Sequence, residues 1–214
     1  MIKPARSITL QLIIATSVFF LAVSLLTYKN PLLAGYIALV PSKILGMQMP
    51  WTLVTSMLMH ANLSHLFMNM LSLMFLGSFL ERIIGGKRFA VFYFASGIFA
   101  GLFFVLSAFL FKMDLNTAAV GASGAIFGIA GVLAVLVPKL PVYIMFIPIA
   151  APMWLAVIIL LLGLWIFSLV AGAPIGNTAH LGGLVAGLAY GFYLRQRHKR
   201  KVLMINRFLL RRGF

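Results

Sequence analysis

The chain has 214 residues, of which 63% are hydrophobic and 9% charged, and its mean hydropathy of +1.11 excludes an ordinary soluble domain. Its net charge is +15, but eight of the 17 Lys and Arg residues follow Leu194, mixed with Leu, Ile and Phe. We therefore expect a tail held on anionic lipid, not a nucleic-acid-binding protein. The absence of cysteine excludes disulfides, thiolate metal sites and cysteine nucleophiles.

Six apolar stretches are long enough to cross, or nearly cross, the hydrocarbon layer of a membrane. Because unpaired backbone groups are forbidden in lipid, all six are predicted to be helices. We expect an all-α integral membrane protein, with a six-helix domain over residues 1–194 and a basic cytoplasmic tail at the membrane surface over residues 195–214. The stretches are Ile8–Thr27, Leu63–Leu80, Phe89–Phe111, Ser123–Val137, Ala150–Val170 and Thr178–Leu194.

The distribution of Lys and Arg predicts the orientation of these helices. With a cytoplasmic N-terminus, the inner segments hold 14 basic residues, including Lys3 and Arg6, and the outer segments hold 3. Basic residues concentrate in cytoplasmic loops, so both termini are predicted to be cytoplasmic. We expect a multi-pass protein of a prokaryotic cell membrane.

The first connection, Tyr28–Asn62, is long and unusually apolar. We expect it to lie partly in the outer membrane interface, with Trp51 at the level of the headgroups. The fourth and sixth stretches contain glycines at short, regular spacing, including Gly183, Gly187 and Gly191. Such spacing gives one helix face a smooth groove and predicts close helix packing.

Strongly polar side chains are rare within the predicted spans, and such side chains mark function because they are costly in lipid. Ser123, His180, His65 and Asn69 stand out. With the predicted orientation, all four fall near the outer ends of the second, fourth and sixth helices. Residues far apart in sequence should therefore meet at one depth.

These residue types suit nucleophilic catalysis. Ser123 is a candidate nucleophile and His180 its candidate base. Backbone N–H groups at a helix start, including that of Ser123, could bind a developing oxyanion. His65 and Asn69 are four residues apart on one helix face and could donate to the same oxygen.

A third catalytic residue is less evident, because the chain has only two acids. Glu81 is predicted at the inner end of the second helix, whereas Asp114, in an outer loop, stays open as a partner of His180. We favour a Ser–His dyad. An aspartyl mechanism would need paired carboxylates, and a zinc mechanism would need HExxH, so neither fits. Alone, each polar residue could be structural, and we expect His60 to be a hydrogen-bonding residue at the interface.

The motifs around these residues resemble those of the rhomboid family of intramembrane serine proteases. "GASGAIFG" resembles the family's G-x-S-G motif, "AHLGGLVAGLAYG" its last core helix, and "HANLSHLFMNMLSLMFLG" its second helix. The inner turn "ERIIGGKRF" is also similar, and the likeness covers roughly residues 50–191. The family often has Trp-Arg before the second helix, whereas Thr52 follows Trp51 here.

The resemblance implies a compact six-helix bundle with a water-filled cavity open to the outside. It implies catalytic roles for Ser123 and His180, oxyanion contacts from His65 and Asn69, and packing of Phe127 on the catalytic histidine. Substrates would be single-pass membrane proteins cut near the outer boundary, with no cofactor and no metal. The alternatives are a rhomboid-like protein that binds or chaperones membrane clients without cutting them, and a transporter.

Overall fold

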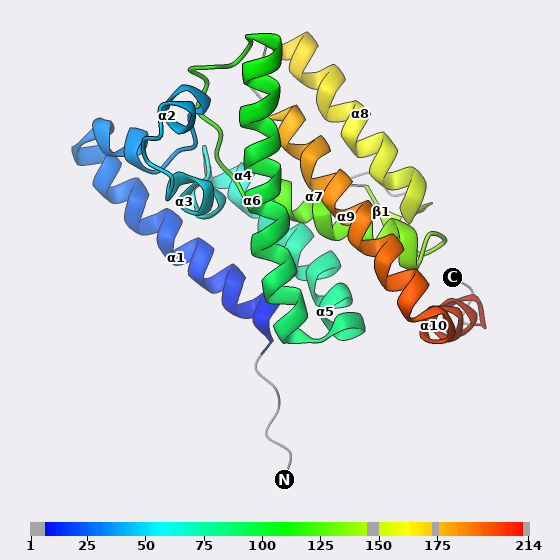
Figure 1. Ribbon diagram of the computed structural model, residues 1–214. Coiled ribbons are helices and arrows are strands. Elements are labelled where there is room, and N and C mark those ends of the chain that lie inside the picture. The colour runs from blue at the N-terminus through cyan, green and yellow to red at the C-terminus, as the bar shows by residue number, and fades with distance from the viewer. Residues whose placement is uncertain (1–6, 145–149, 173–175, 212–214) are drawn as a thin grey trace.

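The computed structural model of the protein describes residues 7–144, 150–172 and 176–211. The described chain is mostly helical, and its helices form one bundle (Figure 1). Among the described residues, four helices are long and apolar enough to cross a membrane, counting the continuous stretch Leu63–Ile84 as one helix. They are α1 (Ile8–Lys29), α4–η2–α5 (Leu63–Ser72, Leu73–Gly77 and Ser78–Ile84), α6 (Gly86–Phe111) and α8 (Met153–Ala171).

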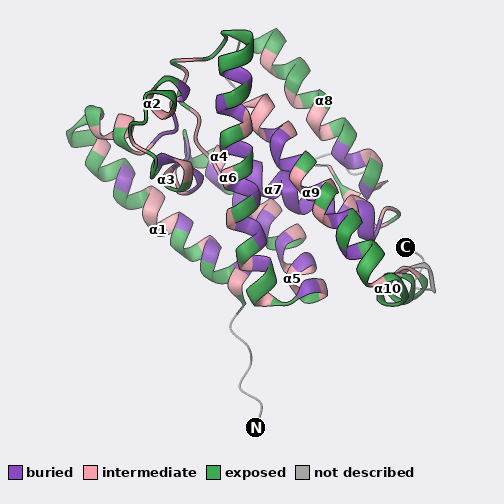
Figure 2. Cartoon of the chain, in the orientation of Figure 1, coloured by how far each residue is buried: buried purple, intermediate pink, exposed green. Residues whose placement is uncertain are grey.

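The fourth and sixth predicted spans are α7 (Ser123–Leu136) and α9 (Asn177–Arg197). Neither of these two helices is both long and apolar enough to count as a membrane-crossing helix by itself. Helix α7 has 14 residues, a length of about 21 Å, against a hydrocarbon thickness of about 30 Å. All of its residues except Ser123 and Ala134 are buried. Figure 2 shows α7 as the buried centre of the bundle, whereas much of the surface of α1 and α8 is exposed. Its neighbours therefore separate α7 from lipid.

Glycines explain how α7 and α9 pack along each other more extensively than any other pair of helices. A Cβ atom at Gly183 would overlap the carbonyl oxygen of Gly124, and one at Gly187 would overlap that of Gly128. The two backbones are thus in direct contact, as expected for small residues at four-residue spacing.

The start of α1 is held by the second spanning helix. The carboxylate of Glu81 in α5 accepts hydrogen bonds from the Ile8 and Thr9 N–H groups at 2.8 and 2.9 Å. It also accepts from the hydroxyls of Ser7 and Thr9, at 3.0 and 2.6 Å. An acid at a helix N-terminus satisfies free N–H donors and complements the helix dipole.

The long first connection consists of three short helices, η1 (Pro31–Tyr36), α2 (Pro41–Leu45) and α3 (Thr52–Leu58). Leu39 and Ala119 exchange two backbone hydrogen bonds, which join this connection to the loop before α7. Trp51 is 52% exposed, and its Nε1 donates to the Tyr36 carbonyl oxygen at 2.9 Å. Internal hydrogen bonds thus anchor the connection although it lacks a Trp-Arg pair.

The described chain departs from the all-helical expectation between α7 and α8. Strands β1 (Pro141–Tyr143) and β2 (Ala150–Pro152) pair antiparallel, so the predicted start of a helix at Ala150 is wrong. Proline favours an extended conformation in the residue before it and cannot donate a backbone hydrogen bond, and Pro152 accordingly ends β2 as the N-cap of α8.

The predicted boundary at Leu194 between bundle and tail does not coincide with a helix end. Helix α9 continues to Arg197, and α10 (Lys199–Arg211) follows it at one end of the bundle (Figure 1). Lys3, Arg6 and Arg212, which contribute to the predicted orientation, lie outside the described residues.

Candidate active site

Ser123 and His180 are in direct contact. Ser123 Oγ lies 2.7 Å from His180 Nε2, within hydrogen-bond distance. Ser123 is the first residue of α7, and His180 lies in the first turn of α9. The glycine contact that begins with Gly124 and Gly183 brings these two helix starts together. The serine is half-buried, whereas the histidine is buried.

The imidazole of His180 is oriented by an aromatic ring and not by a carboxylate. Phe127 stacks on it, with ring centroids 4.7 Å apart and an interplanar angle of 23°. Within the described residues His180 Nδ1 has no hydrogen-bond partner. The Asp114 carboxylate accepts instead from the Thr117 hydroxyl at 3.3 Å. The geometry is therefore that of a serine–histidine pair, with neutral His180 able to accept the Ser123 proton when its own proton is on Nδ1.

The start of α7 offers backbone donors beside Ser123. The N-cap residue Ala122 makes no side-chain capping bond, and the helix begins at Ser123. The first N–H groups of a helix lack partners within that helix. Such groups can bind an oxyanion that forms next to the serine hydroxyl.

His65 reaches this region from α4. A Cβ atom added at Gly121 would lie 3.0 Å from His65 Nε2 and 3.7 Å from Ser123 Oγ, so imidazole and hydroxyl border the same small space. Gly121 has a φ of 122°, a conformation that favours glycine, and its N–H donates to the Ser56 carbonyl oxygen at 2.8 Å. The absent side chain at Gly121 is what allows His65 and Ser123 to approach.

Asn69 is buried one turn after His65 on the same helix. Its Nδ2 donates to the His65 backbone carbonyl oxygen at 2.8 Å, and Oδ1 has no hydrogen-bond partner among the described residues. In this conformation at least one Asn69 donor is used within its own helix. The side chain supports His65 and is not seen in contact with Ser123.

His60, predicted as a hydrogen-bonding residue at the interface, is buried within the bundle. It is 3% exposed, and in the described part of the chain neither ring nitrogen makes a hydrogen bond of standard geometry, although the Leu58 backbone lies close enough to raise the pKa of the ring slightly. Its ring makes edge contacts with His65, at a centroid distance of 5.0 Å, and with Phe20. Burial, with a smaller contribution from the His65 imidazole, lowers the pKa of His60 to about 4. A neutral imidazole here acts as a packing residue behind His65.

Gly121 is the site residue that the sequence analysis overlooked. It is the first letter of "GASGAIFG", two positions before the serine. The motif alone does not tell a packing glycine from one that makes room for a histidine of another helix. Its position two residues before Ser123 in that motif is the feature of the sequence that could have identified it as a site residue.

A serine hydroxyl within hydrogen-bond distance of a histidine, at buried helix starts in a bundle of apolar helices, can support nucleophilic chemistry within a membrane protein. Comparison with known families adds a second observation, because residues 47–197 match the Rhomboid domain. That match covers well over half of the chain, and the protein belongs to the rhomboid family of membrane proteins.

Curated relatives include proteases and an inactive member. The chain is 35% identical over 137 residues to rhomboid protease GluP of Bacillus subtilis, covering 64% of this chain and 24% of the relative. It is 29% identical over 154 residues to mitochondrial rhomboid protein 1 of Saccharomyces cerevisiae, covering 70% and 44%. Inactive RHOMBOID-like protein 8 of Arabidopsis thaliana is 40% identical over 81 residues, covering 38% and 21%. The chain thus spans less than half the length of these three relatives.

Proposed function

We propose that the protein is an intramembrane serine endopeptidase that cleaves single-pass transmembrane proteins with a Ser123–His180 dyad. The observation that carries the proposal is the 2.7 Å contact between Ser123 Oγ and His180 Nε2 at the start of α7. Membership of a family that contains proteases supports it.

In the proposed reaction, Ser123 Oγ attacks the scissile carbonyl carbon while its proton passes to His180 Nε2. The α7 N–H groups and His65 donate hydrogen bonds to the developing oxyanion. Asn69 either keeps its hydrogen bond to the His65 backbone carbonyl oxygen or rotates its side chain to donate to the oxyanion as well. The C–N bond then breaks as His180 returns the proton to the leaving amine. This leaves an ester on Ser123. Water, deprotonated by His180, attacks that ester; the acyl C–Oγ bond breaks, His180 returns the proton to Ser123 Oγ, and the new carboxyl group is released.

The membrane arrangement belongs to the same proposal. Helices α7 and α9 would complete a six-helix domain over residues 1–194, with its catalytic core at about residues 50–191 and both termini in the cytoplasm of a prokaryotic cell. The four spanning candidates and the 14-to-3 split of basic residues support this topology. In this orientation Ser123 lies towards the outer face, where a substrate would be cut near the outer membrane boundary.

A family member that binds membrane clients without cutting them is the second candidate, favoured by the likeness to an inactive plant protein. The two functions differ in whether Ser123 is chemically reactive. A transporter has no support from the site, because the polar contact lies at the ends of α7 and α9 and not midway along them.

Labelling with an active-site-directed fluorophosphonate separates the two functions without knowledge of the substrate. The purified protein should be labelled, whereas Ser123→Ala and His180→Ala should not. Ser96→Ala is a matched control, because this buried α6 serine donates to the Tyr93 carbonyl oxygen of its own helix and should leave labelling unchanged. Labelling that persists in Ser123→Ala would reject the nucleophile, and an unlabelled wild type would favour client binding.

A further inference from the structure

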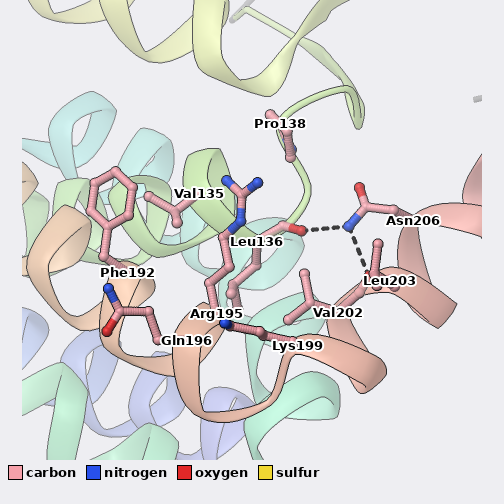
Figure 3. Close-up of a pocket in the computed structure, with 10 residues that line it drawn as sticks. All are labelled: Val135, Leu136, Pro138, Phe192, Arg195, Gln196, Lys199, Val202, Leu203 and Asn206. Atoms are coloured by element: carbon pink, nitrogen blue, oxygen red, sulfur yellow. Dashed lines mark hydrogen bonds between the residues drawn. The ribbon is translucent and has the colours of Figure 1, made fainter.

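A pocket of about 540 Å³ lies at the end of α7 opposite Ser123, between the last turn of that helix and helices α9 and α10 (Figure 3). It is distinct from the candidate active site. Its volume is in the range typical of small-molecule sites. The lining residues are Val135, Leu136, Pro138, Phe192, Arg195, Gln196, Lys199, Val202, Leu203 and Asn206.

The lining combines apolar walls with basic groups. Val135 and Leu136 are buried at one wall, whereas Phe192 and Leu203 keep 52% and 57% of their surface exposed. Arg195 of α9 and Lys199 of α10 supply two cations to the same pocket. No acidic residue lines it to neutralise them. A ligand that is apolar at one end and anionic at the other would contact the apolar walls and also pair with Arg195 and Lys199.

Hydrogen bonds and apolar contacts hold helix α10 against the bundle. Asn206 Nδ2 donates to the Leu136 carbonyl oxygen at the end of α7, at 2.7 Å (Figure 3). Lys201 Nζ donates to the Ile83 carbonyl oxygen at the end of α5, at 2.8 Å. Val202 and Ile205 pack against the core of the bundle. These contacts hold a basic amphipathic helix across the helix ends, as such helices lie at a membrane interface.

We propose that this pocket binds one anionic phospholipid, with its phosphate on Arg195 and Lys199 and an acyl chain along Phe192 and Leu203. Charge complementarity requires an anion, and a guanidinium with an ammonium binds phosphate well. Apolar walls beside the cations favour an acyl chain over a soluble anion. The proposal is a defined site, beyond the general attraction of a basic tail to an anionic surface.

Native mass spectrometry of the detergent-solubilised protein, titrated with phosphatidylglycerol or phosphatidylcholine, tests the site. Arg195→Gln/Lys199→Gln should weaken binding of the first phosphatidylglycerol by about tenfold or more. The matched control is Arg200→Gln/Arg207→Gln, which removes the same charge from exposed α10 positions outside the pocket. This control should bind nearly as well as wild type. Equal losses in both pairs, or equal binding of phosphatidylcholine by wild type, would overturn the proposal.

Two further measurements test the acyl-chain half of the site. Leu203→Trp keeps all charges but fills the pocket, so binding of the first phosphatidylglycerol should be lost. Binding as tight as that of the wild type would overturn the proposal. Soluble glycerol 3-phosphate should compete poorly, and competition as effective as that of the lipid would show a phosphate site instead. All variants are made on Ser123→Ala as well as wild type, so that the result does not depend on the protein being a protease.

Discussion

Ser123 Oγ and His180 Nε2 lie 2.7 Å apart although 57 positions separate the two residues in the sequence. Ser123 begins α7 and His180 lies in the first turn of α9, and the two helices touch through glycine backbones. The reactive geometry therefore depends on how closely α7 and α9 approach. Substitutions along their contact should affect activity even where no catalytic group is changed.

Gly187→Ala tests this dependence. Its methyl group would overlap the Gly128 carbonyl oxygen, which neither backbone can avoid without separating. We expect the free energy of unfolding to fall by about 1–3 kcal/mol and fluorophosphonate labelling of Ser123 to slow. Thermal unfolding in detergent and the labelling rate measure the two effects. Gly163→Ala in α8 is the control, because nothing lies within 4 Å of its added Cβ, and it should be neutral or stabilising. Wild-type stability in Gly187→Ala would contradict the packing.

Gly121→Ala should disable the oxyanion region more than it harms the fold. The new Cβ would lie 2.8 Å from His65 Cε1, and its φ of 122° disfavours any side chain. If His65 stabilises the oxyanion, kcat on a single-pass reporter substrate should fall by about 10²-fold. The double variant Gly121→Ala/His65→Ala should lose little more than His65→Ala alone. Fully additive losses would show that Gly121 acts independently of His65.

Glu81→Gln should loosen the start of α1. Glutamine has one acceptor oxygen where the carboxylate has two, and its NH₂ group faces donors at Ser7, Ile8 and Thr9. We expect a loss of about 1–2 kcal/mol in stability and faster amide hydrogen exchange at Ile8 and Thr9. Glu81→Asp, which retains the charge but shortens the side chain, should lose less exchange protection than Glu81→Gln. Unchanged exchange in Glu81→Gln would refute the capping role.

His60 should make stability depend on pH. Its pKa is lowered from 6.5 to about 4 in the folded protein, so the unfolded chain binds more protons between these values. Stability should therefore fall as pH drops from 6.5 towards 4, and the His60 contribution should level off below that. His60→Leu removes the titrating group at similar volume and should show a shallower decline in thermal unfolding temperature over this range. An unchanged slope would mean that His60 is protonated normally in the fold.

The four candidate membrane helices and the contact between Ser123 and His180 could be predicted from the sequence. Long apolar runs must be helical in lipid, and polar residues in such runs are rare enough for their depths to be compared. The glycine spacing at Gly183 and Gly187 likewise predicted close helix packing, because residues without a bulky side chain let two backbones approach.

Other features could not be predicted, because a side chain can choose between several hydrogen-bond or packing partners and the sequence pattern does not show which one it contacts. Asn69 could donate across the site or within its helix, and the structure has it bonded to the His65 carbonyl oxygen. His60 looked like a polar interface residue, yet aromatic neighbours bury it. The strand Ala150–Pro152 is as apolar as the helix that follows it, so composition alone predicts a helix start there. Its pairing with Pro141–Tyr143 is what shows that it is a strand.

The buried position of α7 has a consequence for biosynthesis. A helix of 14 residues that is enclosed by its neighbours gains little from contact with lipid alone, so it has to enter the bilayer together with other segments. It carries the proposed nucleophile, whereas the proposed base lies in α9, which follows α7 and α8 in the chain. A nascent or truncated chain that stops before α9 would lack the proposed base, so the proposed dyad would form only once α9 has joined the bundle.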